Sequence, residues 1–159
     1  MSEKASLEER VVEKLKEKGW KIVCAESCTG GMLASTLVNV AGVSQVLGES
    51  YVTYANSAKE KLLGVSGDTL ERLGAVSSQV AEQMAKGAAK KAEAQAAIAV
   101  TGIAGPDGGT PDKPVGLVFI GCFADGKVVV TENHFEGNRL EIRRQTVKAA
   151  LLQLLDCLE

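Results

Sequence analysis

The chain has 159 residues, a length that suits one compact domain with a buried core. Hydrophobic residues make up 45% and charged residues 24% of it, which is typical of a globular protein and argues against a disordered one. The 18 basic and 20 acidic residues give a net charge of -2, without the basic excess of a nucleic-acid-binding protein. No apolar stretch is long enough to span a bilayer, and the polar N-terminus lacks the apolar segment of a secretory signal. We therefore expect a cytoplasmic protein with neither membrane nor nucleic-acid partners.

The cysteine and histidine content argues against disulfides and metals. The four cysteines are Cys24, Cys28, Cys122 and Cys157, too few for a disulfide framework at this length. Cys24 and Cys28 do not have the C-x-x-C spacing of redox or zinc sites, and His134 is the only histidine. We therefore expect reduced thiols and no metal.

The first part of the chain predicts a helix, a strand, a turn and a second helix. A helix near 6–18 opens with a capping box and stops at Gly19. Residues 20–25 form a short apolar run typical of a buried strand, and 32–40 form an apolar run typical of a helix. The small-residue turn at 26–31 between them would gather backbone amides at a helix N-terminus.

The remainder alternates helices with strands and ends in a hairpin and a helix. The predicted elements are a strand at 46–54, a helix that Asn56 would cap and Gly64 would end, a short helix at 66–73, an alanine-rich helix from Ser77 to about 92, a buried strand at 96–101, a Gly- and Pro-rich loop at 102–114, strands at 115–124 and 127–136 joined by Asp125-Gly126, and a last amphipathic helix from Asn138. Together they predict one α/β domain, a three-layer α/β/α sandwich with a mixed sheet.

Ser27 is the first candidate for chemistry, because it stands at the end of a strand in the sequence AESCTGG. The amides of Cys28, Thr29, Gly30 and Gly31 could point at a developing oxyanion, which the dipole of the following helix would also favour. The alternative is that Ser27 or Thr29 only caps that helix. Cys28 is a rival nucleophile, but it has no evident histidine partner.

A serine nucleophile needs a base, and the sequence offers few. His134 lies in an alternating strand and is expected to face solvent or a neighbouring strand, which disfavours a Ser-His-Asp triad. Tyr54 and Lys59 flank a strand end that turns into a helix, at the same sheet edge as Ser27. Lys59 can act as a base only if burial or a nearby cation lowers its pKa. Otherwise Tyr54 is a strand aromatic and Lys59 a surface residue.

A glycine-rich loop at 102–110 is the second candidate, because its backbone could approach an anion closely. It matches neither the P-loop nor the dinucleotide-binding fingerprint, so a flexible surface turn remains the alternative. Thr101 and Thr110 add hydroxyl donors beside it. Three arginines open the last helix, at Arg139, Arg143 and Arg144. They form either a solvated helix face or a phosphate site.

In their order along the chain, these segments resemble the CinA C-terminal domain family, the nicotinamide-nucleotide amidases of PncC type. The matching motifs are 25–31 (AESCTGG), 52–56 (VTYAN) with Lys59, 74–77 (GAVS), 102–109 (GIAGPDGG) with 113–116 (KPVG), and 135–139 (FEGNR) with 143–145 (RRQ). The resemblance covers residues 6 to 158 and implies a single CinA-like amidohydrolase domain over 1–159. Some members carry a nucleotide-hydrolysing domain in front, for which this chain has no room, so it looks like the stand-alone form.

The resemblance implies a metal-free, cofactor-free reaction in which nicotinamide mononucleotide and water give nicotinate mononucleotide and ammonia. Ser27 would be the nucleophile, assisted by Lys59 directly or through Tyr54, with the oxyanion held by amides of 28–31. The residues expected to bind the nucleotide are Asn56, Thr101, Gly102, Gly105, Gly108, Gly109 and Arg144, the last at the phosphate.

Two other functions stay open at this point: a non-catalytic nucleotide-binding or partner-binding module of the competence-damage-inducible family, and a Ser/Lys hydrolase of another amide. Ala55 departs from the family pattern, since many members have Ser there, and any polar contact from that position is lost. The family and the common symmetry of oligomers favour a homodimer.

Overall fold

The computed structural model describes residues 4–159, which fold into six helices, a 3-10 turn and one five-stranded sheet. The helices are α1 (Leu7–Lys18), α2 (Met32–Val38), α3 (Asn56–Leu63), α4 (Gly67–Leu73), α5 (Ser78–Ala92) and α6 (Arg139–Leu158), with the 3-10 turn η1 at Val43–Gln45. The strands are β1 (Ile22–Glu26), β2 (Tyr51–Val52), β3 (Ala96–Gly102), β4 (Leu117–Ala124) and β5 (Lys127–His134).

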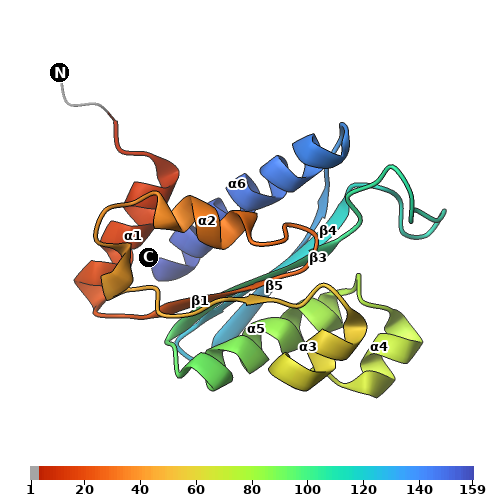
Figure 1. The fold of residues 1–159 in the computed structure, drawn as a ribbon, viewed down its shortest axis with the longest axis horizontal. Helices are drawn as coiled ribbons and strands as arrows, with labels where there is room; N and C mark the ends of the chain where they lie inside the picture. Colours follow the sequence, from red (N-terminus) through yellow and green to blue (C-terminus); the bar gives the residue numbers. More distant parts are fainter. Residues whose placement is uncertain (1–3) are drawn as a thin grey trace.

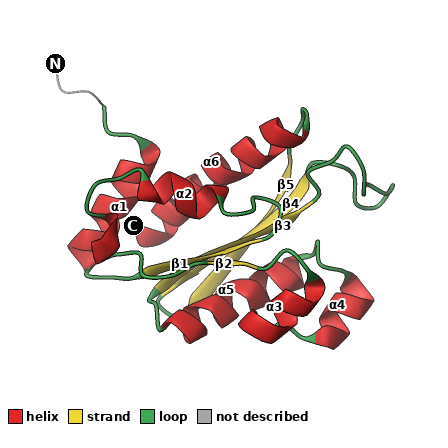
Figure 2. Cartoon of the chain, viewed as in Figure 1, coloured by secondary structure: helices red, strands yellow, loops and turns green. Residues whose placement is uncertain are grey.

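Helices cover both faces of the sheet, whose strand order is β2-β1-β3-β4-β5. Helices α1, α2 and α6 lie on one face, and α3, α4 and α5 lie on the other (Figures 1 and 2). Strands β2, β1 and β3 are parallel, whereas β4 and β5 continue the sheet as an antiparallel hairpin. The predicted three-layer α/β/α sandwich with a mixed sheet is therefore confirmed.

The three parallel strands end at one edge of the sheet. Glu26 at the end of β1 pairs with Val52 on one side and Val100 on the other. The chain leaves β1 toward α2 on one face and leaves β2 toward α3 on the opposite face (Figure 1). In parallel α/β sheets such a divergence opens a crevice at the carboxyl ends of the strands. The residues that follow β1 and β2 meet across this crevice.

Most predicted caps and turns are present. Ser6 and Asn138 open α1 and α6 with full capping boxes, and Ser77 caps α5 through the amide of Val80. Asp125 and Gly126 both have positive φ, at 47° and 84°, as a type I′ hairpin turn requires. Local side-chain chemistry thus sets these boundaries.

Two predictions about the region before α3 are wrong. The strand expected at 46–54 is only two residues long, because the hydroxyl of Ser50 accepts from the amide of Cys24 at 3.2 Å and takes the place of a ladder carbonyl. Asn56 is the first residue of α3 and not its cap. The N-cap is Ala55, which makes no side-chain hydrogen bond.

The sheet is buried between two apolar clusters, one on each face. Ile22 and Cys24 of β1 pack toward α1, α2 and α6, while Val23 and Ala25 pack toward α5. All four cysteines are free thiols, as expected. None of the helices in the described part of the chain has both the length and the apolar character that a membrane crossing needs.

Candidate active site

Ser27 and Lys59 meet across the crevice, although they are 32 residues apart in sequence. Ser27 directly follows β1, and its hydroxyl accepts a hydrogen bond of 3.1 Å from the Nζ of Lys59, in the first turn of α3. Ser27 does not cap α2, whose N-cap is Gly31 with no side-chain hydrogen bond. The serine is therefore free of the capping role that was its alternative explanation.

Lys59 is buried, with 1% of its surface exposed to solvent, which is an unusual environment for an amine. Its Nζ also donates to the carbonyl oxygens of Thr53 at 2.7 Å and Tyr54 at 3.1 Å. None of the ion pairs among residues 4–159 includes it. Burial lowers the pKa of Lys59, and the nearby Cys28 opposes this with a smaller effect. A neutral amine can give its two hydrogens to the two carbonyls and direct its lone pair at Ser27.

Tyr54 lies at the mouth of the site. Its side chain is 60% exposed, and its phenol accepts a 3.0 Å hydrogen bond from Nη2 of Arg139. Among the described residues, no hydrogen bond joins the phenol to Ser27 or Lys59. Only the main-chain carbonyl of Tyr54 contacts the lysine. The geometry therefore supports direct proton transfer between Ser27 and Lys59, without the phenol as a relay.

The carboxylate of Glu26 fills the N-terminus of α2. This fully buried side chain accepts from the amides of Gly31 at 3.2 Å, Leu33 at 2.8 Å and Ala34 at 3.0 Å, and from the hydroxyl of Thr29 at 2.6 Å. The helix end that could bind a foreign anion is thus satisfied by the chain's own negative charge. Glu26 was not among the predicted site residues, although an acidic residue at the end of an apolar strand, just before a helix, is a visible signal.

This arrangement corrects the predicted oxyanion site. The amide of Gly30 donates to the carbonyl of Ser27 at 3.1 Å, and that of Gly31 is held by the carboxylate just described. Neither is free to meet a substrate oxygen. Cys28 lines the pocket in front of Ser27, and its amide makes no backbone hydrogen bond within residues 4–159. The Cys28 amide, next to Ser27, is therefore the amide of this turn best placed to donate to a bound molecule.

The pocket in front of Ser27 has a volume of about 210 Å³. It is lined by Ser27, Cys28, Tyr54, Asn56, Lys59, Ala75, Val76, Thr101, Gly102, Ala104 and Arg139. Asn56, Thr101 and Gly102 thus lie where a bound molecule would touch them, although the hydroxyl of Thr101 is already used in a 2.9 Å bond to the carbonyl of Ala75.

Part of the glycine-rich loop lies elsewhere. Gly108 and Gly109 line a separate, open hollow with Pro106, Thr110 and Val115. In Figure 1 this loop between β3 and β4 extends beyond the end of the sheet. Gly105 contributes only its carbonyl, which accepts from Nη1 of Arg139 at 2.7 Å. Gly108 and Gly109 therefore do not line the Ser27 pocket, and their expected contact with the nucleotide stays a prediction.

Arg144 is also not at the site. It is exposed and outside the pocket, whereas Arg139 lines the pocket and bridges Tyr54 and Gly105. Arg143 faces the same side and donates to the carbonyls of Cys28 and Thr29. Residues four apart share a helix face, whereas a residue five positions on points elsewhere, so Arg139 and Arg143 turn toward the Ser27 turn and Arg144 does not.

The rival chemical groups are poorly suited. Burial raises the pKa of the Cys28 thiol to about 11, so it is not a thiolate at neutral pH. His134 lies on the far edge strand β5, where its side chain is 61% exposed and faces Glu132 at 3.5 Å, away from the site as expected. Within residues 4–159, no group of three His, Cys, Asp or Glu side chains could share a metal ion.

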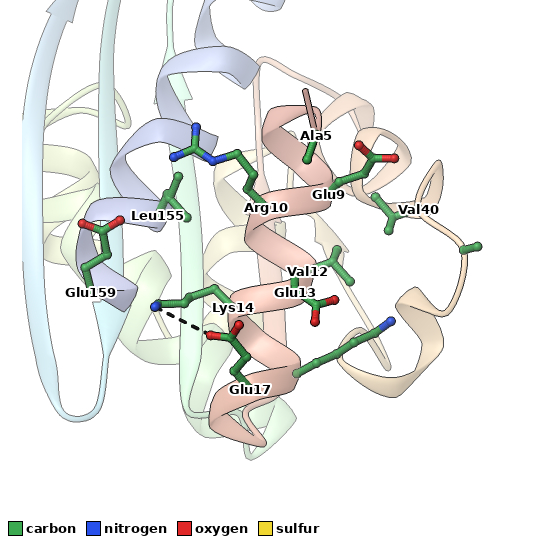
Figure 3. Close-up of a pocket in the computed structure, with 12 residues that line it drawn as sticks. Ala5, Glu9, Arg10, Val12, Glu13, Lys14, Glu17, Val40, Leu155 and Glu159 are labelled. Carbon is green, nitrogen blue, oxygen red and sulfur yellow. Dashed lines mark ion pairs between the residues drawn. The ribbon is translucent and has the colours of Figure 1, made fainter. Parts of the chain in front are cut away.

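A larger hollow of about 500 Å³ lies elsewhere, along α1 (Figure 3). Its walls are mainly charged side chains of that helix, with Val40 and Leu155 on the neighbouring segments. Lys14 and Glu17 form an ion pair of 3.7 Å along its rim. The charged side chains lining it are exposed or half-buried, so we do not assign chemistry to it.

The CinA C-terminal domain matches residues 4–158. The chain belongs to this family. A CinA-like protein from Kosmotoga olearia is 51% identical over 146 residues, which are 92% of this chain and 35% of that protein. The chain therefore spans about a third of the length of such curated relatives.

Solved structures of the CinA superfamily have the same fold. The competence/damage inducible protein CihA from Agrobacterium tumefaciens is 43% identical with a TM-score of 0.94, and the match covers 100% of both chains. A CinA superfamily protein from Escherichia coli is 36% identical with a TM-score of 0.90, covering 97% of this chain and 93% of that one. The resemblance noted in the sequence is thus confirmed at the level of family and fold.

Proposed function

We propose that this CinA-family domain is a serine amidohydrolase that converts nicotinamide mononucleotide and water into nicotinate mononucleotide and ammonia. The observation that carries the proposal is the 3.1 Å contact between Ser27 Oγ and the buried amine of Lys59. A serine hydroxyl becomes a useful nucleophile when an adjacent base removes its proton. The substrate is inferred from the family resemblance, and the reaction type is inferred from the Ser27 and Lys59 side chains in the pocket.

The first half of the reaction forms an ester. The neutral Lys59 amine takes the proton of Ser27 while its own hydrogens remain bonded to the carbonyls of Thr53 and Tyr54. Ser27 Oγ attacks the carboxamide carbon, and the amide of Cys28 donates to the resulting oxyanion. Lys59 then gives the proton to the leaving nitrogen, the C–N bond breaks, and ammonia departs.

The second half regenerates the enzyme. A water molecule enters in place of ammonia and loses a proton to Lys59 as it attacks the ester carbon. The C–O bond to Ser27 breaks, the lysine returns the proton to the serine, and the nicotinate carboxylate is released. The same amine therefore acts as base and acid in both steps.

The pocket volume supports a placement in which only part of the nucleotide lies inside the pocket. A volume of about 210 Å³ is below the range of roughly 300–1,000 Å³ common for drug-sized ligands, so only the pyridine carboxamide enters it fully. The ribose and phosphate extend past the mouth, where Arg139 is exposed beside Tyr54. We assign the phosphate contact to Arg139 because a guanidinium can bind a phosphate through two parallel hydrogen bonds.

Ammonia release from nicotinamide mononucleotide tests the proposal, with the wild type compared to a folded Ser27→Ala variant. We expect release by the wild type, a loss of about 10³-fold or more in Ser27→Ala, and no effect of EDTA. Release only from other amides would assign a different substrate to the same machinery. No release from any amide by well-folded protein would leave a nucleotide-binding or partner-binding module.

A further inference from the structure

The guanidinium of Arg143 lies behind the Ser27 turn and binds its backbone. Nε donates to the carbonyl oxygen of Cys28 at 3.0 Å, and Nη2 donates to that of Thr29 at 2.9 Å. Arg143 is half-buried and does not line the Ser27 pocket. A side chain from the far end of the sequence thus holds two consecutive carbonyls beside the nucleophile while staying clear of any substrate.

These contacts fix the direction of the Cys28 amide. In a trans peptide the C=O and the following N–H point in opposite directions. The bond from Gly30 to the Ser27 carbonyl orients the peptide unit that contains the Cys28 N–H, and Arg143 orients the next unit through the Cys28 carbonyl. Both peptide units around Cys28 are therefore held. Turning its N–H away from the pocket would require the bond from Gly30 to break. Arg143 supports that bond, because the Thr29 carbonyl that it binds belongs to the peptide unit that carries the Gly30 N–H.

The charge of Arg143 acts on the same point. Burial raises the pKa of the Cys28 thiol most, and a hydrogen bond with its own backbone lowers it. The Arg143 guanidinium also lowers this pKa, while the Glu26 carboxylate raises it. The turn thus lies between a buried negative charge at the α2 N-terminus and a positive charge from α6. An oxyanion forming beside Cys28 would be stabilised by the guanidinium, whose effect on the Cys28 thiol is larger than that of Glu26.

We propose that Arg143 is a positioning residue for the oxyanion, which holds the Cys28 amide in its donating direction and adds positive potential without touching the substrate. The inference rests on the proposed amidase function, since an oxyanion forms here only if Ser27 attacks a carbonyl group. A lysine cannot replace it fully, because only a planar guanidinium presents two donors in a fixed fork to two carbonyls.

The test uses p-nitrophenyl acetate, a small activated ester whose reaction with Ser27 does not depend on nucleotide recognition. Release of p-nitrophenolate is followed for the wild type, Arg143→Met, Arg143→Lys and the exposed neighbour Arg144→Met, with Ser27→Ala as the blank. We expect Arg143→Met to acylate about 10²-fold more slowly, Arg143→Lys to fall between it and the wild type, and Arg144→Met to stay within about twofold. Binding of nicotinate mononucleotide by Arg143→Met should be unchanged.

Each outcome decides the matter. Acylation of folded Arg143→Met at the wild-type rate would overturn the proposal, as would weakened nucleotide binding equal to the loss in rate, which would make Arg143 a substrate contact. If Arg143→Met does not fold, full acylation by Arg143→Lys overturns it. Wild-type protein that is acylated at Ser27 but leaves nicotinamide mononucleotide intact would refute the proposed function and leave this inference standing. No acylation of wild-type Ser27 would refute both.

Discussion

Two hollows of this molecule, one along α1 and one in front of Ser27, differ in size and in the residues that line them. The groove along α1 has about 500 Å³ and is walled by charged side chains with access to water. The Ser27 pocket has about 210 Å³, yet Lys59 at its base is 1% exposed and has no carboxylate partner among the described residues. The smaller hollow is the one in which burial lowers the pKa of a lysine.

The difference follows from the cost of burying charge. Removing an ammonium group from water is expensive unless a counter-charge replaces the lost hydration, so the group favours its neutral form. Lys59 is in this position, and its neutral form is the one a serine needs beside it. Lys14 at the α1 groove has Glu17 and water around it. A buried amine with a lowered pKa is therefore a better reason than cavity volume to choose the Ser27 pocket as the candidate site.

Replacing each of the two lysines in turn tests the difference between the two hollows. Lys59→Met should lower kcat for ammonia release by about 10³-fold, within the range of general-base catalysis, because Ser27 would lose its proton acceptor. Lys14→Met, the matched change at the α1 groove, should leave kcat within about twofold. Comparable losses in both variants, or turnover by Lys59→Met at the wild-type rate, would end the distinction between the two hollows.

A second change separates the arginine that lines the pocket from the one that does not. Arg139→Ala should raise the KM for nicotinamide mononucleotide by about 10- to 100-fold, the effect of losing hydrogen bonds to a charged group. For nicotinamide riboside, which has no phosphate, the KM should change far less. Arg144→Ala serves as the control and should change neither. An equal rise for nucleotide and riboside would remove Arg139 from the phosphate site.

The pH dependence tests the protonation state directly. Only the unprotonated amine can accept a proton, so kcat/KM should rise about tenfold per pH unit below the pKa of Lys59 and become constant above it. Because burial lowers that pKa, the plateau begins below the ordinary lysine value of about 10.4. Between the two values the unfolded chain binds the extra proton, so Lys59 makes stability rise with pH in that window. A rate profile that is flat over the whole range would contradict the assignment.

The smallest effect concerns the start of α3. Ala55 occupies its N-cap with φ -80° and ψ 150°, a conformation that suits a capping serine, yet it offers no acceptor to the helix amides. Ala55→Ser should therefore stabilise the fold by about 1 kcal/mol, measured by urea denaturation. Asn56→Ala is the control and should have little effect on the cap, since Asn56 lies inside the helix. If Asn56→Ala lowered the free energy of unfolding by as much as Ala55→Ser raises it, Asn56 would be the cap of α3 after all.

The pairing of Ser27 with Lys59 was accessible from sequence, because strand ends and helix starts are local signals and parallel strands share an edge. The burial of Lys59 could not be predicted, since it depends on how α3 packs against the sheet. The short β2 also escaped prediction: its ladder bond is replaced by the hydroxyl of Ser50, which no hydrophobic pattern reveals.

The choice of Arg144 among the three arginines of α6 differs from the structure for another reason, since Arg139 lines the pocket and Arg144 does not. Arg139 and Arg143 are four apart on α6, and Ile142 and Thr146 beside them are buried, so helical phase alone separates them from exposed Arg144. The spacing of the three arginines relative to Ile142 could therefore have separated Arg144 from the other two by sequence alone. Glu26 is harder, because one carboxylate in an apolar strand identifies its partners only when the turn that follows brings four donors onto it.

The most direct test of the account is the acyl-enzyme itself. Wild-type protein is mixed with nicotinamide mononucleotide, quenched in acid during the first turnover, and digested for mass spectrometry. We expect the peptide carrying Ser27 to gain the mass of nicotinate mononucleotide less water, as an ester on that hydroxyl. Attachment to Cys28 or Lys59 instead, or full-rate ammonia release by Ser27→Ala, would contradict it.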